Sequence, residues 1–420
     1  MESEPGSCSQ SKKGRSDRPS DHSPSPSPSP SHGVAINALP REIVVDILSR
    51  LPAPSLFRAQ FVCRSWRALA RDPLLLQLHR HRAASAHDPS LVFHCDHPLR
   101  SQLSFVDGVS GGDGRNRPAR ISHPPFGVVA PEFDLVGSSE GLLCLANALY
   151  SDDVYVYNPL TREFRELPDS AGHQRKREMV FGFGFDETEK DYKVIKIVYA
   201  IMIRHGRPRR VLLGNSEVQV CSLRSPTWRR LGNATNHLEV TPSQPLINRR
   251  LHWTSRGTRC NIRIVSFDLS DEQFREVPVP KSMDLRRHRY HLVELGGCLS
   301  AAVLLPSGVL KIWVMKEYGM KESWIKDYSI GSYLPRGLQN HEHEESNDPS
   351  CKISRILNRK RCGLYVRVLG MLRNGGILLE YHNRALVRYD PNCDKAVDLM
   401  LEGLPKWFES VVLASSISRM

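Results

Sequence analysis

The sequence predicts an α+β protein with two folded parts, a small all-α module followed by an all-β domain built from repeats. Residues 39–79 carry apolar side chains at helical spacing. From about residue 90 onward, short apolar or alternating runs are separated by Gly, Pro, Asn and Asp, the pattern of all-β chains. Several of these runs recur as similar units, which predicts a propeller-like repeat domain. A β-sandwich is the alternative architecture.

Residues 1–33 precede both parts and are rich in Ser and Pro, with four consecutive Ser-Pro pairs between Ser23 and Pro30. Such a segment has no apolar groups to offset its ordering entropy, so we expect a disordered tail. The Ser-Pro pairs suit proline-directed kinases, and an unmodified flexible leader is the alternative. The first residues have no apolar core and do not resemble a secretory signal.

The first helix is expected to begin at Leu39-Pro40, because proline suits the first helical position, where its missing N–H costs nothing. Charged residues such as Arg41 and Asp46 fall on the face opposite the apolar one. The apolar residues that recur on one face of this helix are Ile43, Val44, Ile47, Leu48 and Leu51.

Three more helices are predicted to follow. Pro52 ends the first helix, and Pro54 begins a second that carries Leu56. Cys63 and Trp66 lie on the apolar face of a third helix, and Asp72-Pro73 opens a fourth. About forty residues cannot enclose this much apolar surface without a staple or a partner. The module is therefore expected to dock on another protein.

This run resembles an F-box in the order and spacing of its residues, from Leu39-Pro40 through the Val62-Cys63-Arg64-Ser65-Trp66 block to Asp72-Pro73. The resemblance implies binding to the Skp adaptor, and through it to the cullin, of a Skp–cullin–F-box ubiquitin ligase. Cys63 and Trp66 are expected to join the second and third helices, with part of that surface facing the adaptor. The residues expected to dock on the adaptor are Leu39, Pro40, Ile43, Ile47, Leu48, Leu51, Pro52 and Leu56.

The repeats of the second part share a turn. A strand ends in an aromatic residue followed by Asn or Asp, as in Tyr157-Asn158-Pro159, Phe267-Asp268-Leu269 and Tyr389-Asp390-Pro391, and a return strand follows. Asn and Asp begin turns well, because their side chains can accept hydrogen bonds from the backbone beyond. No single repeat could bury its apolar face alone, so neighbouring repeats must stack. The units seen suggest about six blades.

These units resemble the F-box-associated region of plant F-box proteins, on the residues GLLCL and VYVYNPLTREFRELP of segment 141–168 and on FGFGFDETEKDYKVIKI of segment 181–197. The resemblance gives three parts: the tail at 1–33, an F-box at 34–82 and an F-box-associated β domain at 83–420. It implies that the β domain binds a protein target, of unknown identity, for ubiquitylation and proteasomal degradation. A binding module that acts outside a ligase is the alternative.

The net charge is +13, and the basic residues cluster, for example in Arg204–Arg210 and in Arg286–Arg289. Phosphate contacts with nucleic acid are one interpretation. They are disfavoured, because no recognition helix or aromatic stacking motif accompanies the clusters. An acidic protein partner, or solubility, explains the charge as well.

Residue patterns of catalytic or metal sites are not evident. His94-Cys95 and His97 alternate on an expected strand, and no second cluster completes a tetrahedron. We therefore expect no catalytic residue, no metal and no cofactor, and we expect a non-catalytic adaptor. An enzyme of sugar-hydrolase type would need two converging carboxylates, which the aligned units do not share.

The sequence has no run of 18 apolar residues, so no membrane span is expected. Its ten scattered cysteines favour the cytoplasm or the nucleus.

Overall fold

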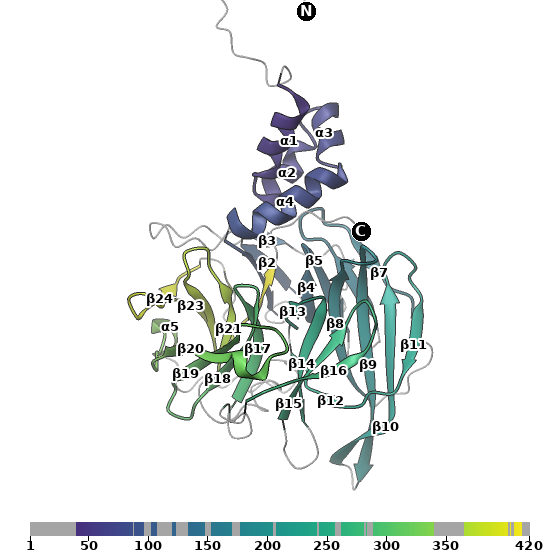
Figure 1. Cartoon of the computed structure of the whole chain (residues 1–420), viewed down its shortest axis with the longest axis vertical. Coiled ribbons are helices and arrows are strands. Elements are labelled where there is room, and N and C mark those ends of the chain that lie inside the picture. Colours follow the sequence, from purple (N-terminus) through teal and green to yellow (C-terminus); the bar gives the residue numbers. More distant parts are fainter. Residues whose placement is uncertain are drawn as a thin grey trace, which may run out of the picture. The chain divides into compact units, whose positions relative to one another are not determined.

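The structure is a computed structural model, and Figure 1 shows its helices and strands. It describes residues 39–86, 88–95, 102–106, 120–122, 133–147, 153–169, 177–204, 207–241, 243–256, 262–280, 283, 289–339, 365–401, 404 and 407–413. The chain divides into two compact units, residues 1–44 and residues 45–420, with the boundary inside the first helix. The predicted tail at 1–33 and the basic cluster at 286–288 lie outside the described residues.

The four predicted helices are confirmed. Pro52 stands at the N-cap of the second helix with φ of −55°, and the first turn that follows contains a proline, as the sequence indicated. Cys63 differs from expectation, because it precedes the third helix as its N-cap and its Sγ accepts a hydrogen bond from the Trp66 N–H at 3.4 Å. The helices are α1 (Arg41–Ser49), α2 (Ala53–Ala59), α3 (Arg64–Leu69) and α4 (Pro73–Ala86).

The β domain is a six-bladed propeller, so the propeller prediction is confirmed and the sandwich alternative is wrong. Its strands form six antiparallel sheets. The first sheet has β25 (Glu409–Leu413), β1 (Ser90–Cys95), β2 (Gln102–Val106) and β3 (Arg120–Ser122). The second has β4 (Asp134–Ser139), β5 (Leu142–Ala146), β6 (Val154–Tyr157) and β7 (Phe164–Glu166). The third has β8 (Arg177–Asp186), β9 (Asp191–Arg204), β10 (Arg207–Ser222) and β11 (Trp228–Gly232).

The remaining sheets continue in chain order. The fourth has β12 (His237–Leu238), β13 (Leu246–Ile247), β14 (Arg250–Arg256), β15 (Ile262–Asp268) and β16 (Phe274–Val277). The fifth has β17 (Arg289–Leu295), β18 (Cys298–Leu304), β19 (Leu310–Met315) and β20 (Trp324–Ile330), with the short helices η2 (Lys321–Ser323) and α5 (Arg336–Gln339) nearby in sequence. The sixth has β21 (Val366–Met371), β22 (Ile377–Tyr381), β23 (Ala385–Asp390) and β24 (Lys395–Leu399).

The ring is closed by strands from opposite ends of the domain. β25 pairs with β1, so that Val411 lies opposite Val92 and Leu413 opposite Ser90. The first sheet therefore takes one strand from the C-terminal end of the domain and three from its start. This pairing covers the edge of β1 that β2 leaves free, and β25 becomes the edge strand of the sheet.

The core of the propeller lies between its sheets. Among the described residues, six apolar clusters each join two neighbouring sheets. In one, Val92 of the first sheet packs with Tyr157 of the second. In another, Phe93 of the first sheet packs with Leu378 of the sixth, which completes the ring. The prediction that no repeat buries its apolar face alone is therefore confirmed.

Two glycines of β8 have a role that the sequence did not reveal. A glycine inside a strand can simply mark a bulge. A Cβ at Gly182 would instead lie 2.5 Å from Cζ2 of Trp253, and a Cβ at Gly184 would lie 2.8 Å from Cδ1 of Leu269. Both partners belong to the fourth sheet or its turn, so these glycines allow the third and fourth sheets to approach closely.

The predicted aromatic-Asx turns are confirmed as the hairpins β6–β7, β15–β16 and β23–β24. In each, the Asx Oδ1 accepts a hydrogen bond from the backbone N–H two residues later, at 2.9, 3.0 and 2.9 Å respectively. The residue four positions after the Asx adopts a left-handed backbone, with φ between 52° and 62°. These left-handed residues are Arg162, Glu272 and Asp394.

Candidate partner-docking surface

The first helix presents two apolar side chains to solvent. Ile43 is 47% exposed and Ile47 is 39% exposed, one helical turn apart on α1. Leu48 follows Ile47 directly and is 0% exposed. Successive helical residues are rotated by about 100° around the axis, so one of these neighbours faces outward and the other inward. This helix therefore contributes both to the module's own core and to an apolar surface.

The other predicted docking residues fall into two groups. Pro40 is exposed, whereas Leu56 is 0% exposed, like Leu48. In this conformation a partner cannot touch the side chains of Leu48 and Leu56, so these two support the surface from beneath. The predicted residues that are half-buried are Leu39, Leu51, Pro52, Cys63 and Trp66.

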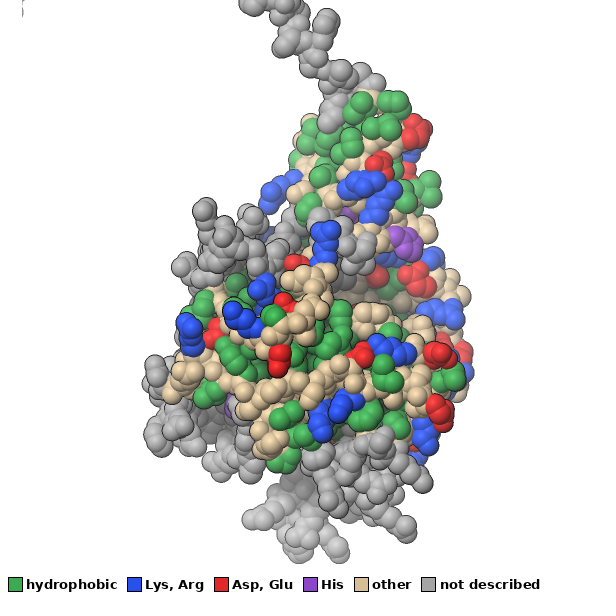
Figure 2. All heavy atoms as spheres, turned by 60° about the vertical axis from the view of Figure 1, so that its left-hand side comes forward, with side chains coloured by type: hydrophobic (Ala, Val, Ile, Leu, Met, Phe, Trp, Pro, Cys, Tyr) green, Lys and Arg blue, Asp and Glu red, His purple; other side chains and the backbone are tan. Residues whose placement is uncertain are grey.

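Four apolar residues that the sequence analysis did not assign to docking are exposed as well. Phe61 is 69% exposed, and Val62, which follows it between α2 and α3, is 64% exposed. Leu74 and Leu78 are 69% and 39% exposed, one turn apart on α4. Figure 2 shows hydrophobic side chains gathered over the helices. The sequence does not show which of these apolar residues face a core and which face a partner, because helical periodicity cannot tell the two kinds of stripe apart.

Polar contacts fasten α4 to the first helix and the turn after it. Arg82 Nη1 donates to Asp46 Oδ1 at 2.7 Å, and His79 Nε2 lies 2.9 Å from the Leu51 carbonyl oxygen. Hydrogen bonds from Arg50 and Arg82 hold the pKa of Asp46 below its ordinary value. These contacts position the helices that carry the exposed apolar residues.

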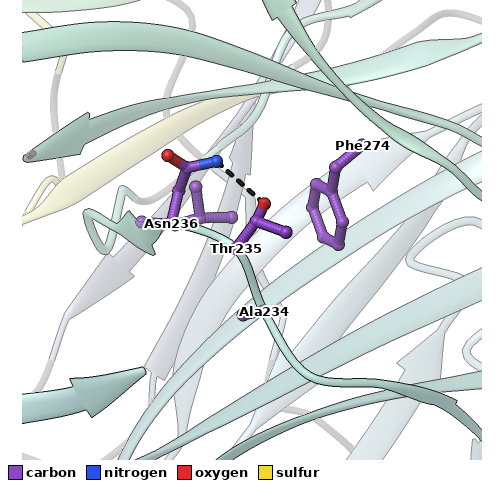
Figure 3. Close-up of a pocket in the computed structure, with 5 residues that line it drawn as sticks. Ala234, Thr235, Asn236 and Phe274 are labelled. Carbon is purple, nitrogen blue, oxygen red and sulfur yellow. Dashed lines mark hydrogen bonds between the residues drawn. The ribbon is translucent and has the colours of Figure 1, made fainter. Parts of the chain in front are cut away.

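One candidate site for a small molecule in the described part of the propeller is a small depression. A depression of about 140 Å³ is lined by Ala234, Thr235, Asn236, Leu238 and Phe274. Figure 3 shows it, with Asn236 Nδ2 donating to Thr235 Oγ1 at 2.9 Å. Sites for drug-sized ligands usually enclose several hundred Å³, so this depression is too small for one.

Clusters of titratable residues are a second kind of candidate site. Among the described residues, no group of three His, Cys, Asp or Glu is placed to hold a metal ion. His94 and Cys95 are buried in β1, and the His94 ring stacks on Phe133 with centroids 4.9 Å apart. His97 lies outside the described residues. Within the described helices, none is long and apolar enough to span a membrane.

Comparison with known families explains the two parts of the fold. The F-box-like family model matches residues 36–80, and the model of the F-box associated beta propeller domain matches residues 123–351. This chain is a member of the F-box protein family. Its exposed helical module is therefore the F-box, and its six-bladed ring is the F-box-associated propeller.

Two relatives of this F-box protein match along most of their length. F-box protein At3g07870 of Arabidopsis thaliana is 43% identical over 404 residues, which cover 92% of this chain and 93% of the relative. F-box protein CPR1 of the same plant is 25% identical over 411 residues, which cover 90% and 88% of the two chains. The resemblance to plant F-box proteins with an F-box-associated domain is thus confirmed.

Proposed function

We propose that this chain is the substrate-recognition subunit of a Skp–cullin–F-box ubiquitin ligase. The F-box docks on the Skp adaptor, and the propeller binds a protein target so that the target is held near the ubiquitin-charged enzyme. The chain acts by tethering, which raises the effective concentration of the target's lysines. No bond is made or broken by its own side chains.

The observation that carries this proposal is the set of exposed apolar residues on the F-box. Ile43, Ile47, Phe61 and Leu74 are each at least 39% exposed on a module that is itself small. Exposed apolar residues gathered on one small module are typical of protein interaction sites. A helical module docks by such a face, with anchors spaced by one helical turn, and Ile43 and Ile47 have that spacing.

The test is a pull-down of the purified chain with a Skp adaptor, comparing the wild type with Ile47→Asp. Burying an uncompensated carboxylate at an interface costs several kcal/mol, so binding should weaken by about 100-fold or more. Val240→Asp makes a similar apolar-to-acidic change at a side chain that is 63% exposed on the propeller, and it should bind like the wild type.

Circular dichroism separates loss of binding from loss of folding. Ile47 is partly exposed, so the variant should keep the wild-type spectrum and melting curve. A folded wild-type chain that does not bind the adaptor would contradict the proposal and would favour a binding module that acts outside a ligase.

We also propose that the protein works in the cytoplasm or the nucleus. The six cysteines in the described regions are all free thiols, and Cys144 and Cys221 are buried. Burial raises the pKa of the Cys221 thiol to about 11, which keeps it protonated and unreactive. Such thiols suit a reducing compartment. Fluorescence microscopy of the tagged full chain in plant cells tests this placement, and accumulation in the secretory pathway would contradict it.

A further inference from the structure

An imidazole joins the first strands of two neighbouring sheets. β17 of the fifth sheet and β21 of the sixth lie side by side (Figure 1). His291 on β17 accepts a hydrogen bond at Nε2 from the backbone N–H of Val368 on β21, with the two nitrogens 2.8 Å apart. Each of the two strands is the edge of its own sheet. His291 therefore satisfies a backbone donor of β21 across the contact between the two sheets, which we call the seam.

The alternation of β17 shows that His291 faces the sixth sheet. Val293 and Leu295 follow it on the same side of the strand, and both belong to the apolar cluster shared by the fifth and sixth sheets. Val368 belongs to that cluster too. Leu292, on the other side of β17, belongs to the cluster shared by the fourth and fifth sheets. His291 is thus a half-buried polar side chain at a seam that apolar residues fill.

The hydrogen bond to His291 requires the neutral imidazole. A backbone N–H can only donate, so the accepting nitrogen must carry a lone pair. Protonation would place a second N–H on Nε2, and two donors would then face each other across 2.8 Å. Histidine is the residue type that ordinarily changes charge between about pH 5 and 8. Mild acid therefore removes this bond.

A second imidazole acts in the same direction just before β21. The Tyr365 N–H donates to Nε2 of His382, in the turn between β22 and β23, at 3.4 Å. This bond also needs the neutral ring. It is longer than the bond to His291 and therefore weaker.

The other titratable groups described around the seam are uncharged or already bonded. Glu294 of β17 is exposed, and its Oε1 accepts a backbone N–H of the next turn at 2.9 Å. Burial raises the pKa of Tyr381 to about 12, so this side chain of β22 stays neutral. Asp398 accepts hydrogen bonds from the Tyr333 hydroxyl and the Arg336 N–H, each at 2.8 Å. Further thiol and phenol groups at the seam, which are uncharged in mild acid, belong to Cys298 and Tyr328.

β21 also holds the strand that closes the ring. Toward β25, Arg367 donates to the Ser410 carbonyl oxygen, and Glu380 Oε2 accepts the Ser410 N–H at 2.8 Å. Arg367 directly precedes the residue that His291 holds. Glu409 Oε1 lies 3.7 Å from Arg367 Nη1, and burial raises the pKa of this carboxyl, so Glu409 is a further group here that responds to acid. Displacement of β21 would therefore loosen its hold on β25.

We infer that the seam between the fifth and sixth sheets is an acid-sensitive joint of the propeller, controlled by His291. Above about pH 6.5 the neutral imidazole holds β21 against β17, and this contribution to stability is lost as the pH falls and the ring binds a proton. Release of β21 weakens the grip of Arg367 on β25, so the ring loosens beside its closure. The inference concerns the propeller alone and does not depend on the ligase proposal.

Hydrogen–deuterium exchange of the full chain, followed by mass spectrometry at pH 7.5 and pH 5.5, tests this inference. Exchange is expressed as protection factors, so that the pH dependence of the intrinsic exchange rate cancels. In the wild type, protection of β21 should fall about tenfold between the two pH values, as expected for the loss of one hydrogen bond. Protection of β5, a strand of the second sheet without histidine, should change less than about twofold.

His291→Gln is the matched variant, because its amide oxygen can accept the Val368 N–H and does not titrate. It should keep wild-type protection of β21 at pH 7.5 and lose less than about threefold at pH 5.5. His291→Leu removes the acceptor, so protection of β21 should be low at both pH values. Circular dichroism checks that each variant is folded.

Two results would overturn the inference. One is unchanged protection of β21 in the wild type at pH 5.5, a result that needs no variant. The other is an equal fall in the wild type and in His291→Gln, which would assign the acid effect to other groups such as His382 or Glu409. Exchange of β25 provides a second readout: its protection should fall with that of β21 in the wild type, and it should fall less in His291→Gln.

Discussion

At the scale of single residues, the close approach of neighbouring sheets determines which residue types certain strand positions can hold. Gly182 lies in the middle of β8. The space that a side chain at this position would need is occupied by Trp253 of the fourth sheet, which is 0% exposed. From the sequence alone, a glycine inside a strand indicates either a bulge or a close approach. Only the packing of the two sheets distinguishes these possibilities.

Gly182→Ala should therefore destabilise the propeller. The added Cβ would lie 2.5 Å from Trp253, so the indole or the strand must shift, at a cost of about 1–3 kcal/mol in the free energy of unfolding. Gly331→Ala is the control, since a Cβ there meets no atom within 4 Å, and its effect should stay within about 0.5 kcal/mol. Urea unfolding measures both. Equal effects would show that the sheets repack around the methyl group.

Another residue-scale prediction concerns His252 of β14, which is 1% exposed. Its Nδ1 lies 3.1 Å from the Pro245 carbonyl oxygen and its Nε2 lies 2.7 Å from the Tyr318 hydroxyl. Burial lowers the pKa of His252 to about 4, and the nearby charge of Arg250 acts in the same direction. The neutral imidazole is thus the form that the fold accommodates.

The folded pKa lies below the unfolded value of about 6.5, so between these values the unfolded chain binds the proton more readily. The contribution of His252 to stability is therefore present above about pH 6.5 and is lost as the pH falls toward 4, by about 3 kcal/mol in total. Urea unfolding at several pH values should show this slope in the wild type and a shallower one in His252→Gln. Parallel pH profiles for the two proteins would contradict the prediction.

At the scale of elements, the local sequence was a reliable guide. Pro52 and the proline in the first turn after it separate α1 from α2, and the Asx side chains of the three confirmed turns accept the backbone hydrogen bonds that their residue types predict. These features depend on residues within a few positions of each other. They form regardless of what packs against them, which is why the sequence predicts them.

The docking surface was predicted less completely at this scale. Periodicity assigned Ile47 and Leu48 to one apolar face, whereas the first is 39% exposed and the second is 0% exposed. Phe61 and Leu74 were not among the residues predicted to dock, although each is 69% exposed. Which side of an apolar helix is buried depends on the neighbouring helices, and their arrangement is not a local property.

At the scale of the whole molecule, stability depends on the junction between the ends of the propeller. β25 contributes Val411 and Leu413, which are 2% and 6% exposed, to the cluster between the first and second sheets. It is also tied to the sixth sheet, because Glu380 Oε2 accepts a hydrogen bond from the Ser410 N–H at 2.8 Å and Arg367 Nε lies 3.2 Å from Glu380 Oε1.

Truncation tests this junction. Removal of residues 409–420 deletes β25, removes two buried apolar side chains and leaves Glu380 and Arg367 without Ser410, so the free energy of unfolding should fall by about 5 kcal/mol or more. Removal of residues 414–420 keeps β25 and should leave stability near the wild-type value. Urea unfolding and limited proteolysis measure both. A stable, protease-resistant ring after the longer truncation would show that the other five junctions suffice.

Sequence patterns alone predicted the two-part organisation, the four helices, the recurrent Asx turns and the repeat architecture, because these depend on periodicity and on turn chemistry between near neighbours. Its resemblance to F-box proteins also indicated the family, which the comparisons show. Packing in three dimensions is responsible for the closure of the ring by β25 on β1, and for the burial of Leu48 beside the exposed Ile47. The physical reason is that burial and the meeting of strand ends are set by contacts between residues far apart in the chain, which no local pattern encodes.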